Sequence, residues 1–386
     1  MRPRLSRSLC VVLTSPLVLN AFLLNHLRSL ADDWTVTVCV NTQEYPVSSH
    51  LDPRVELQHL PIARSINLYR DMLTLVWLIR LFLRRRFVAV HSVTPKGGLL
   101  AMLAARLASI PHRTHTFTGQ VWANRGGLAR LLLKSMDRVT ALCATAVHAD
   151  SSSQARFLER EGVCATGSVQ VFGAGSISGV DLARFSRLAG RRETMRSTLG
   201  IPADATVFVF LGRHNVEKGV LVLAEAFAQL RGDHPEAWML FVGPDEGGLA
   251  ARLLSVCGDR GRWLGLTDKP EACLDAADVL CLPSYREGFG TVVIEAAAMG
   301  LPAIVSDIYG LTDAVVDQET GLLCPVGDAR ALAAAMRRLL DRDLRLRFGE
   351  AARQRAHESF SAESLTAWWK DYYAGILTPI TLASGR

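Results

Sequence analysis

The stretch Leu282–Asp307 limits the possible folds of this chain more than any other part of it. An apolar run ends at its first residue, and the loop that follows, Ser284–Gly290, contains two glycines. Thr291 is expected to cap a helix that Gly300 terminates, and the apolar run Leu301–Val305 predicts another buried strand. Two strands joined by one helix form a βαβ unit, so this stretch predicts a parallel sheet.

The same loop carries groups for two kinds of hydrogen bond. The backbone amides from Gly288 to Thr291 lie at a helix N-terminus, which is a natural anion site. Glu287 and Glu295 flank these amides, with seven residues between them. Because a carboxylate repels a phosphate, the glutamates are expected to bind hydroxyl groups. Amides for a diphosphate beside carboxylates for hydroxyls indicate a sugar nucleotide as ligand.

The bulk composition is that of a globular protein with two domains. Of the 386 residues, 49% are hydrophobic and 21% are charged, which is enough for two ordinary cores. Aromatic residues make up only 7%, which argues against a nucleic-acid partner bound by stacking. The mean hydropathy of +0.19 is high for a soluble protein and predicts an apolar surface somewhere on the molecule.

The net charge of +6 is spread unevenly along the chain. Residues 1–190 contain 22 Lys and Arg against 11 Asp and Glu, which gives +11, whereas residues 191–386 contain 21 against 26, which gives −5. A basic half favours nucleic acid, anionic lipid or a phosphorylated ligand as partner. Together with the high hydropathy, this favours an anionic membrane surface.

The eight cysteines are scattered, with no CxxC pair. Several of them lie in apolar runs that predict strands. We interpret them as buried free thiols in a reducing compartment, and expect neither a disulfide framework nor a zinc site.

The N-terminus has features of a signal peptide, because three arginines precede the apolar run Leu9–Leu19. However, Pro16 interrupts that run, and no small-residue cleavage site follows it. We therefore interpret Leu9–Thr14 as the first buried strand. No run of about 18 uncharged apolar residues exists, so no membrane span is expected.

The rest of the first half alternates strands and helices. Phe22–Ala31 predicts a helix and Thr35–Val40 a second strand, so the chain opens with a βαβ unit. The longest helical candidate, Ile66–Phe87, is apolar on most faces and ends in three arginines. It is equally compatible with a core helix whose C-terminal dipole attracts cations and with a helix that lies on an anionic membrane.

Two loops in the first half are candidates for binding a substrate. Lys96, Gly97 and Gly98 open a helix, where one cation and two amides can hold a phosphate, although a plain turn explains the pattern equally well. The next loop follows a strand over Thr114–Phe117 and contains Trp122, which is either an apolar lid or a core residue.

The second half repeats the rhythm after a Gly- and Ser-rich crossing at residues 173–181. Thr206–Leu211 predicts an apolar strand, which runs into the loop GRHNVEKG. Arg213 and Lys218 flank this loop at a spacing that lets both side chains point at one anion. The next strand ends at Gly243, where it can line a nucleotide base.

These motifs, in this order, resemble the retaining GT-B glycosyltransferases of family 4. REGFG followed by Glu295 and GLPAIVSD is similar to the donor-site signature of that family, and Arg213 with Lys218 resembles its phosphate clamp. The block from HSVTPKGGLL to HTFTGQVW resembles the bacterial group 1 enzymes that act on polyprenyl-diphosphate-linked sugars. The turn at residues 15–17, Ser-Pro-Leu, departs from the Gly-rich turn of many members.

The resemblance implies an α/β protein of GT-B architecture, with two Rossmann-like, doubly wound parallel-sheet domains facing a cleft. The acceptor domain is expected over residues 1–180 and the nucleotide-sugar domain over residues 181–360. An aromatic-rich last helix, within residues 361–386, is expected to cross back onto the first domain.

The resemblance also implies roles for individual residues. His115 is expected near the point of sugar transfer, Glu287 at the sugar hydroxyls and Glu295 at the ribose. The expected site residues are His115, Arg213, Lys218 and Glu287 for catalysis; Arg213, Lys218, Gly243, Glu287, Gly288, Phe289, Gly290, Thr291 and Glu295 for the donor; and Lys96, Gly97, Gly98, Thr118 and Trp122 for the acceptor.

The implied reaction moves a hexose or N-acetylhexosamine, with retention of configuration, from a nucleotide sugar to a polyprenyl-diphosphate-linked sugar in cell-surface polysaccharide or glycan assembly. UDP is the expected nucleotide, and neither a metal nor a cofactor is expected. The enzyme would work in the cytoplasm, peripherally on the inner face of the plasma membrane. Two alternatives stay open: a sugar-nucleotide epimerase on the same fold, and a non-enzymatic membrane-associated scaffold.

Overall fold

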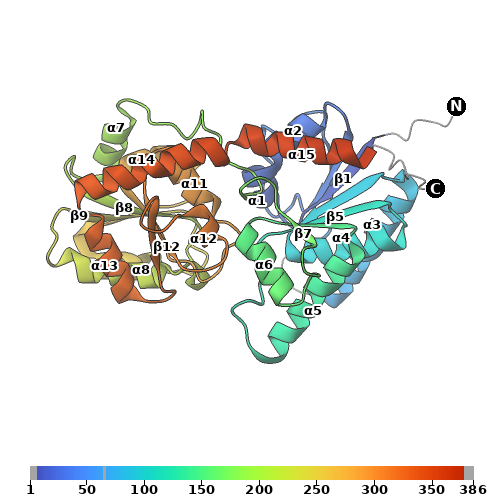
Figure 1. Ribbon diagram of the computed structural model, residues 1–386, viewed down its shortest axis with the longest axis horizontal. Coiled ribbons are helices and arrows are strands. Elements are labelled where there is room, and N and C mark those ends of the chain that lie inside the picture. The colour runs from blue at the N-terminus through green and yellow to red at the C-terminus, as the bar shows by residue number, and fades with distance from the viewer. Residues whose placement is uncertain (1–6, 64–66, 378–386) are drawn as a thin grey trace, which may run out of the picture. The chain divides into compact units, whose positions relative to one another are not determined.

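The computed structural model describes residues 7–63 and 67–377 and divides into two compact units. The first unit comprises Met1–Ser178 and Ala362–Arg386, and the second comprises Gly179–Ser361 (Figure 1). In the described ranges, each unit is built on one parallel sheet with helices packed on its faces. The expected α/β class is therefore confirmed.

The sheet of the first unit has seven strands in the order β3-β2-β1-β4-β5-β6-β7. The strands are β1 (Ser8–Val12), β2 (Thr35–Val40), β3 (Glu56–His59), β4 (Ala89–Val93), β5 (His112–Phe117), β6 (Ala146–Ala149) and β7 (Val169–Gln170). In β1, Leu9 pairs with Val36 on one side and with Ala89 on the other. The interpretation of Leu9–Thr14 as a buried strand is thus confirmed for Leu9–Val12, which lies in a central strand of the sheet.

Helices cover both faces of this sheet. Alternate residues of β1 point to opposite faces, so Val11 packs with residues of α2 and α15, and Val12 packs with residues of α3 and α4. On the latter face α3, α4 and α5 lie side by side. The helices of this unit are α1 (Pro16–Val18), the π-helical turn η1 (Leu19–Leu23), α2 (Leu24–Leu30), α3 (Leu68–Arg85), α4 (Pro95–Leu107), α5 (Gly127–Cys143), α6 (Ser152–Arg160) and α15 (Ala362–Leu377).

The helix α3 accounts for most of the long helical candidate, of which Ile66 lies outside the described residues. Leu78 and Phe82 are buried, which confirms the core interpretation on one side. The opposite side exposes apolar residues such as Tyr69 and Met72, as a helix lying on a membrane requires. Among the helices in the described ranges, none is long and apolar enough to cross a membrane.

The last helix, α15, packs on the first unit through aromatic side chains. Trp369 stacks on His26 and His91, with ring centroids 5.1 and 4.6 Å apart. The hydroxyl of Tyr373 lies 2.6 Å from Nδ1 of the same His91. Because these rings and polar atoms are buried, α15 forms part of the core of this unit.

The sheet of the second unit has six strands in the order β10-β9-β8-β11-β12-β13. The strands are β8 (Thr206–Leu211), β9 (Ala237–Val242), β10 (Gly261–Leu264), β11 (Val279–Leu282), β12 (Ala303–Ser306) and β13 (Gly321–Cys324). The helices are α7 (Arg191–Leu199), η2 (Val216–Lys218), α8 (Val220–Arg231), α9 (Ala250–Cys257), η3 (Gly258–Arg260), α10 (Pro270–Ala276), α11 (Thr291–Ala298), α12 (Leu311–Ala314), α13 (Ala329–Arg338) and α14 (Arg342–Ser359).

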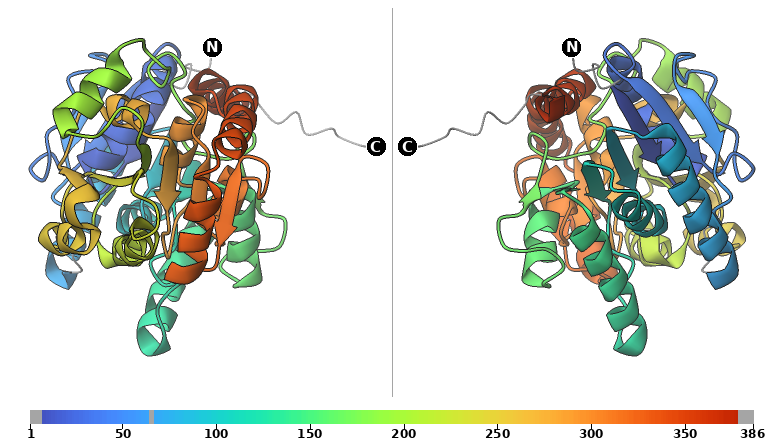
Figure 2. Two further views of the ribbon diagram at one scale, coloured as in Figure 1. Left: turned by 90° about the vertical axis from the view of Figure 1, so that its left-hand side faces the viewer. Right: turned by 90° about the vertical axis from the view of Figure 1, so that its right-hand side faces the viewer.

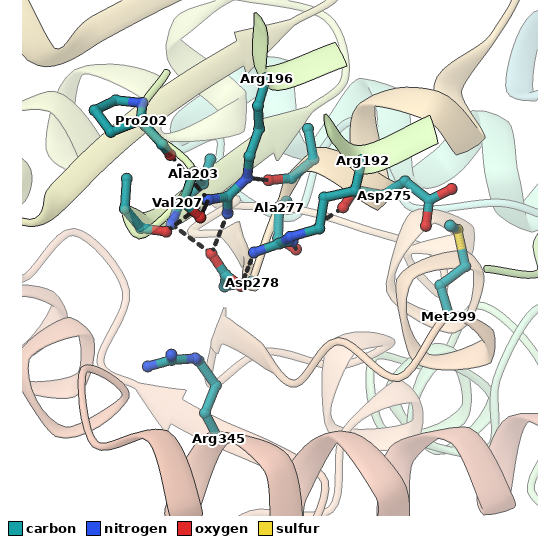
Figure 3. Close-up of polar contacts among 12 residues, drawn as sticks. Arg192, Arg196, Pro202, Ala203, Val207, Asp275, Ala277, Asp278, Met299 and Arg345 are labelled. Atoms are coloured by element: carbon teal, nitrogen blue, oxygen red, sulfur yellow. Dashed lines mark hydrogen bonds and ion pairs between the residues drawn. The ribbon is translucent and has the colours of Figure 1, made fainter. Parts of the chain in front are cut away.

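Arginines of α7 fix that helix to the second unit (Figure 3). The buried Arg196 donates to Oδ2 of Asp278 over 2.8 Å, and Arg192 donates to Oδ1 over 2.7 Å. Oδ2 of Asp278 also accepts the Val207 amide over 2.8 Å. The network joins α7 to the beginnings of β8 and β11 and leaves neither carboxylate oxygen of Asp278 without a partner, which matters because an unpaired buried charge is strongly destabilising.

Candidate functional site

The functional candidates of the second unit lie where the strand order of its sheet reverses. The chain proceeds from β8 to β9 and β10 on one side, and from β11 to β12 and β13 on the other. In open α/β sheets, ligands bind at the carboxyl ends of the strands at such a switch point. The loop after β8 carries Arg213 and Lys218, and the loop after β11 carries Glu287.

Lys218 and Glu287 form an ion pair across this switch point. Nζ of Lys218 donates to Oε1 of Glu287 over 2.5 Å, and Oγ of Ser284 donates to the same oxygen over 2.8 Å. The two side chains are 19% and 13% exposed, so the pair is shielded yet reachable from solvent. A cation held beside a carboxylate suits a ligand that presents both a phosphate and hydroxyl groups.

Backbone contacts hold the two loops together. The Tyr285 amide donates to the Glu217 carbonyl over 2.9 Å, and Arg286 binds the Glu217 carboxylate over 2.8 Å. Gly219 has a φ of +70°, and a Cβ at this position would lie 2.0 Å from the carbonyl oxygen of Pro283. Only glycine fits there, so this residue sets how closely the two loops approach.

Arg213 binds a different partner. Its guanidinium pairs with Glu246 over 3.0 Å, and the side-chain amide of Asn215 donates to the same carboxylate over 3.0 Å. In this structure Arg213 and Lys218 therefore do not converge on one anion, because each cation is bound to its own carboxylate. Glu246 was missed by the sequence reasoning. It lies in the loop after β9, next to β8 in the sheet, and no sequence motif surrounds it.

The start of α11 supplies amides that no capping side chain occupies. Gly290, at a φ of +82°, is the N-cap residue and has no side chain. The expectation that Thr291 caps this helix was wrong, because Thr291 is its first residue. Together with Gly288, these residues place the positive end of a helix dipole beside Glu287, which suits an anion.

Phe289 and Gly243, two of the expected donor residues, have structural roles. The Phe289 ring is 2% exposed and packs against Phe360 at 5.2 Å, so only its backbone can reach a donor. The Gly243 amide already donates to the carbonyls of Leu264 and Gly265 over 3.0 and 3.1 Å. Gly243 lets the ends of β9 and β8 approach, since a Cβ would lie 2.0 Å from a carbonyl oxygen of the β8 loop.

Glu295 lies in the second turn of α11 and is half-buried. Burial raises its pKa to about 7, against the lowering effect of Arg184. Glu271 raises this pKa further, and the same Glu271 pairs with Arg184 over 3.0 Å. Near neutral pH, the Glu295 carboxyl can therefore either accept a hydrogen bond from a hydroxyl or donate one.

The first unit has a similar switch point, between β1 and β4. The hydroxyls of Thr14, after β1, and Thr94, after β4, lie 2.8 Å apart. Thr94 has a φ of +83°, which is strained for a β-branched residue. Such strained residues cluster at functional sites. No sequence pattern predicts this one, because threonine is not typical of positive φ.

The three residues expected to hold an acceptor phosphate at this loop have other partners. Lys96 pairs with Asp71 over 2.5 Å and donates to the Ala63 carbonyl over 2.7 Å. The Gly97 amide donates to Oγ1 of Thr14, and the Gly98 amide donates to the carbonyl of Thr94, the N-cap residue of α4. The expected use of the two glycine amides as a phosphate cradle was therefore wrong, because both amides already have partners.

His115 lies inside β5 with no exposed surface. Its Nδ1 is 2.8 Å from Oγ of Ser92, and its ring packs on Phe117. A Cβ on Gly98 would lie 2.3 Å from the ring, so α4 approaches β5 only because position 98 is glycine. Burial lowers the His115 pKa to about 3. This placement is incompatible with direct contact to a sugar, so the expected catalytic role is replaced by a packing role.

The end of β5 is occupied by Thr118, which is half-exposed and stays a candidate for acceptor binding. Trp122 is only 1% exposed and donates from Nε1 to Asp137 over 2.7 Å. Its ring stacks on Phe157 with centroids 5.3 Å apart. The expectation that Trp122 contacts the acceptor was wrong, and the alternative of a core residue is the correct one.

Two family models divide the chain between them. The model described as "Glycosyl transferase 4-like domain" matches residues 20–174, and the one described as "Glycosyl transferases group 1" matches residues 191–355. The chain belongs to the group 1 glycosyltransferases. Its fold is similar to sucrose-phosphate synthase from Thermosynechococcus elongatus, with a TM-score of 0.81 at 23% identity over 96% of this chain and 99% of that one. The GT-B architecture is therefore confirmed.

Two curated relatives align with most of this glycosyltransferase. The capsular polysaccharide biosynthesis glycosyltransferase CapM of Staphylococcus aureus is 29% identical over 80% of this chain and 82% of its own length. The UDP-Gal:alpha-D-GlcNAc-diphosphoundecaprenol alpha-1,3-galactosyltransferase of Escherichia coli is 28% identical over 77% of this chain and 78% of its own. The expectation of a glycosyltransferase is confirmed at this level.

Among the residues that the structure describes, no group of three or more His, Cys, Asp or Glu side chains is placed to hold a metal ion. All eight cysteines are free thiols, and all but Cys164 are buried. Metal independence stays a prediction.

Proposed function

We propose that this glycosyltransferase moves a hexose or N-acetylhexosamine from a nucleotide sugar to a sugar carried on a polyprenyl diphosphate. The observation that carries the proposal is the Lys218–Glu287 pair at the switch point of the second sheet, beside the uncapped amides of α11. The Escherichia coli relative is named for a UDP-linked donor and a diphosphoundecaprenol-linked acceptor. It supports UDP as the nucleotide and a lipid-linked sugar as the acceptor.

The donor would use the cation and the carboxylate separately. Its diphosphate would take Lys218 and the amides at Gly288–Thr291, and Arg213 would leave Glu246 to join them. Once Lys218 turns to the phosphate, Glu287 keeps its bond from Ser284 and has a free oxygen for a sugar hydroxyl. Glu295 would accept from the ribose when it is ionised.

The chemical step would break the bond between the anomeric carbon and the phosphate oxygen while the acceptor hydroxyl attacks from the same face, so that configuration is retained. Charge develops on the departing diphosphate, and Lys218, Arg213 and the α11 amides are the groups that would stabilise it. The departing phosphate oxygen would take the proton of the acceptor hydroxyl. These groups supply positive charge without a metal ion, which supports metal-independent transfer.

The acceptor would bind at the switch point of the first unit, near Thr118 and the strained Thr94. A polyprenyl carrier stays in the bilayer, so the enzyme would work peripherally at the cytoplasmic membrane face. The exposed apolar and basic side of α3 supports this location, since Tyr69 and Met72 are exposed in its first half and Arg80 and Arg84 in its second half.

A donor and acceptor panel tests the proposal. Release of nucleotide from UDP- and GDP-sugars is measured with and without a short-chain polyprenyl-diphosphate-sugar. The variants compared are Glu287→Ala and the matched control Glu225→Ala, an exposed residue of α8. We expect acceptor-dependent release of one nucleotide that is lost in Glu287→Ala and kept in the control. Product formed without an acceptor would favour an epimerase, and no product from any donor would favour a scaffold.

A further inference from the structure

The helix α5 exposes its apolar side. Leu128, Leu132, Val139 and Leu142 follow one another at helical spacing, and they are 84%, 56%, 38% and 72% exposed. Leu131, which is 58% exposed, widens this stripe. Figure 2 shows α5 extending beyond the neighbouring elements of its unit. These five exposed apolar residues form one stripe, broken at Ser135, whereas single scattered apolar residues are normal on a protein surface.

The charged residues of α5 face inward. Arg130 and Lys134 both bind the Glu161 carboxylate, over 2.8 and 2.7 Å. Asp137 is 5% exposed and accepts from the Trp122 indole. A surface helix of a globular domain normally buries its apolar side and exposes its charged side. In α5 this order is reversed, so its outer stripe is suited to an apolar environment.

The surroundings of the stripe are basic. Residues 67–149, which contain α3, α4 and α5, hold 12 Lys and Arg and two acids, Asp71 and Asp137. Asp71 is paired with Lys96, and the buried Asp137 accepts a hydrogen bond from Trp122, so neither carboxylate opposes an anionic partner. Glu161, outside this range, neutralises two of the twelve cations, Arg130 and Lys134. Because α4 packs between α3 and α5, the apolar sides of the two outer helices belong to one layer of the unit.

A second copy of the chain fits this face poorly. A helix of 17 residues is about 26 Å long and about 10 Å wide, so the stripe offers roughly 260 Å². A stable dimer needs about 800 Å² from each partner. Self-association would also bring two strongly basic layers together, which is electrostatically unfavourable.

We propose that α5 inserts its outer leucines into an anionic bilayer, with the exposed side of α3 as a second contact. This deepens the membrane part of the proposed function and rests on it for the location of the acceptor. The leucines would give binding that persists at high salt, whereas the surrounding arginines and lysines would give binding that salt screens. The apolar stripe, and not only the net charge, would then hold the enzyme at its lipid-linked substrate.

Vesicle sedimentation tests this proposal with the full chain and no donor or acceptor present. The double variant Leu128→Ser/Leu132→Ser is compared with Leu266→Ser/Leu346→Ser, whose leucines are 77% and 59% exposed in the second unit. With phosphatidylcholine–phosphatidylglycerol vesicles at high salt, we expect the α5 variant to bind roughly tenfold more weakly than wild type. The control should bind like wild type, and both variants should keep the wild-type midpoint of thermal unfolding.

Two results would overturn the proposal. One is equal vesicle binding by the α5 variant and wild type at every salt concentration. The other is a wild-type dimer in light scattering that the α5 variant converts to a monomer, since a second copy would then cover the stripe. Failure of the proposed reaction is distinguishable: wild type would bind vesicles as expected yet transfer no sugar to a water-soluble short-chain acceptor.

Discussion

The ammonium of Lys218 lies 2.5 Å from a carboxylate oxygen of Glu287, although the two residues are 69 positions apart in the sequence. The pair joins the loops after β8 and β11, the two strands from which the second sheet grows in opposite directions. Its geometry keeps a cation and a hydroxyl acceptor side by side before any substrate binds. A ligand that carries a diphosphate next to a sugar can use both groups at once.

Replacing Lys218 by alanine is expected to lower kcat/KM for the donor about 10²–10³-fold, because the proposed function makes Lys218 one of the groups that stabilise the departing diphosphate. Steady-state kinetics with the identified donor measure this. Arg337→Ala, which removes an exposed cation of α13, is the control and should leave kcat/KM unchanged. Wild-type kinetics in Lys218→Ala would show that the diphosphate binds elsewhere.

Gly219→Ala is expected to destabilise the second unit by more than about 2 kcal/mol. The added Cβ would lie 2.0 Å from a carbonyl oxygen, at a φ of +70° that alanine adopts with strain. Gly232→Ala is the control, since no atom lies within 4 Å of its Cβ position and its φ is −60°. In denaturant unfolding, the free energy of unfolding of the control should equal that of wild type or exceed it by about 0.4–1 kcal/mol. Equal stability of the two variants would contradict the role of Gly219 in spacing the loops.

The loops with local signals were predictable from the sequence. Gly290 and Gly300 bracket the helix after β11, and apolar runs of strand length gave β8, β11 and β12 within a residue or two. These features depend on backbone preferences and burial that act over a few residues. Thr291 was misplaced by one position because Gly290, at positive φ, takes the cap.

Roles that depend on packing between distant segments were not predictable. His115 and Trp122 carry chemical groups that suggest a site, yet both are buried by helices from other parts of the chain. The exposure of the α5 leucines was equally unpredictable, because the sequence does not show that Arg130 and Lys134 turn inward to Glu161. In each case a tertiary contact decides whether a polar or apolar group reaches solvent.

Glu295→Gln is expected to raise the stability of the protein at pH 8 but not at pH 4. The folded pKa of about 7 lies above the usual 4.5, so the folded state holds the proton more tightly. The stability that the bound proton contributes is present in full below pH 4.5 and is lost as the pH rises to about 7. Chemical denaturation at both pH values should show a gain of about 1–3 kcal/mol at pH 8 only. A gain of the same size at both values would contradict burial of the carboxyl as the cause.

His148→Phe is expected to reduce the loss of stability in weak acid. The His148 ring is fully buried and stacks on Phe172 at 4.5 Å, and burial lowers its pKa from 6.5 to about 4. Protonation therefore favours the unfolded chain, and stability falls as the pH drops from about 6.5 towards 4. Between pH 7 and pH 5 one such histidine lowers the free energy of unfolding by about 2 kcal/mol, and this loss should be absent with phenylalanine at the same place.

Part of the acid sensitivity should remain, because His26 is buried beside α15 with a pKa lowered to about 4 as well. The control His50→Phe, at an exposed position, should follow the wild-type curve. If His148→Phe followed it too, the acid sensitivity of the first unit would have to originate from other groups.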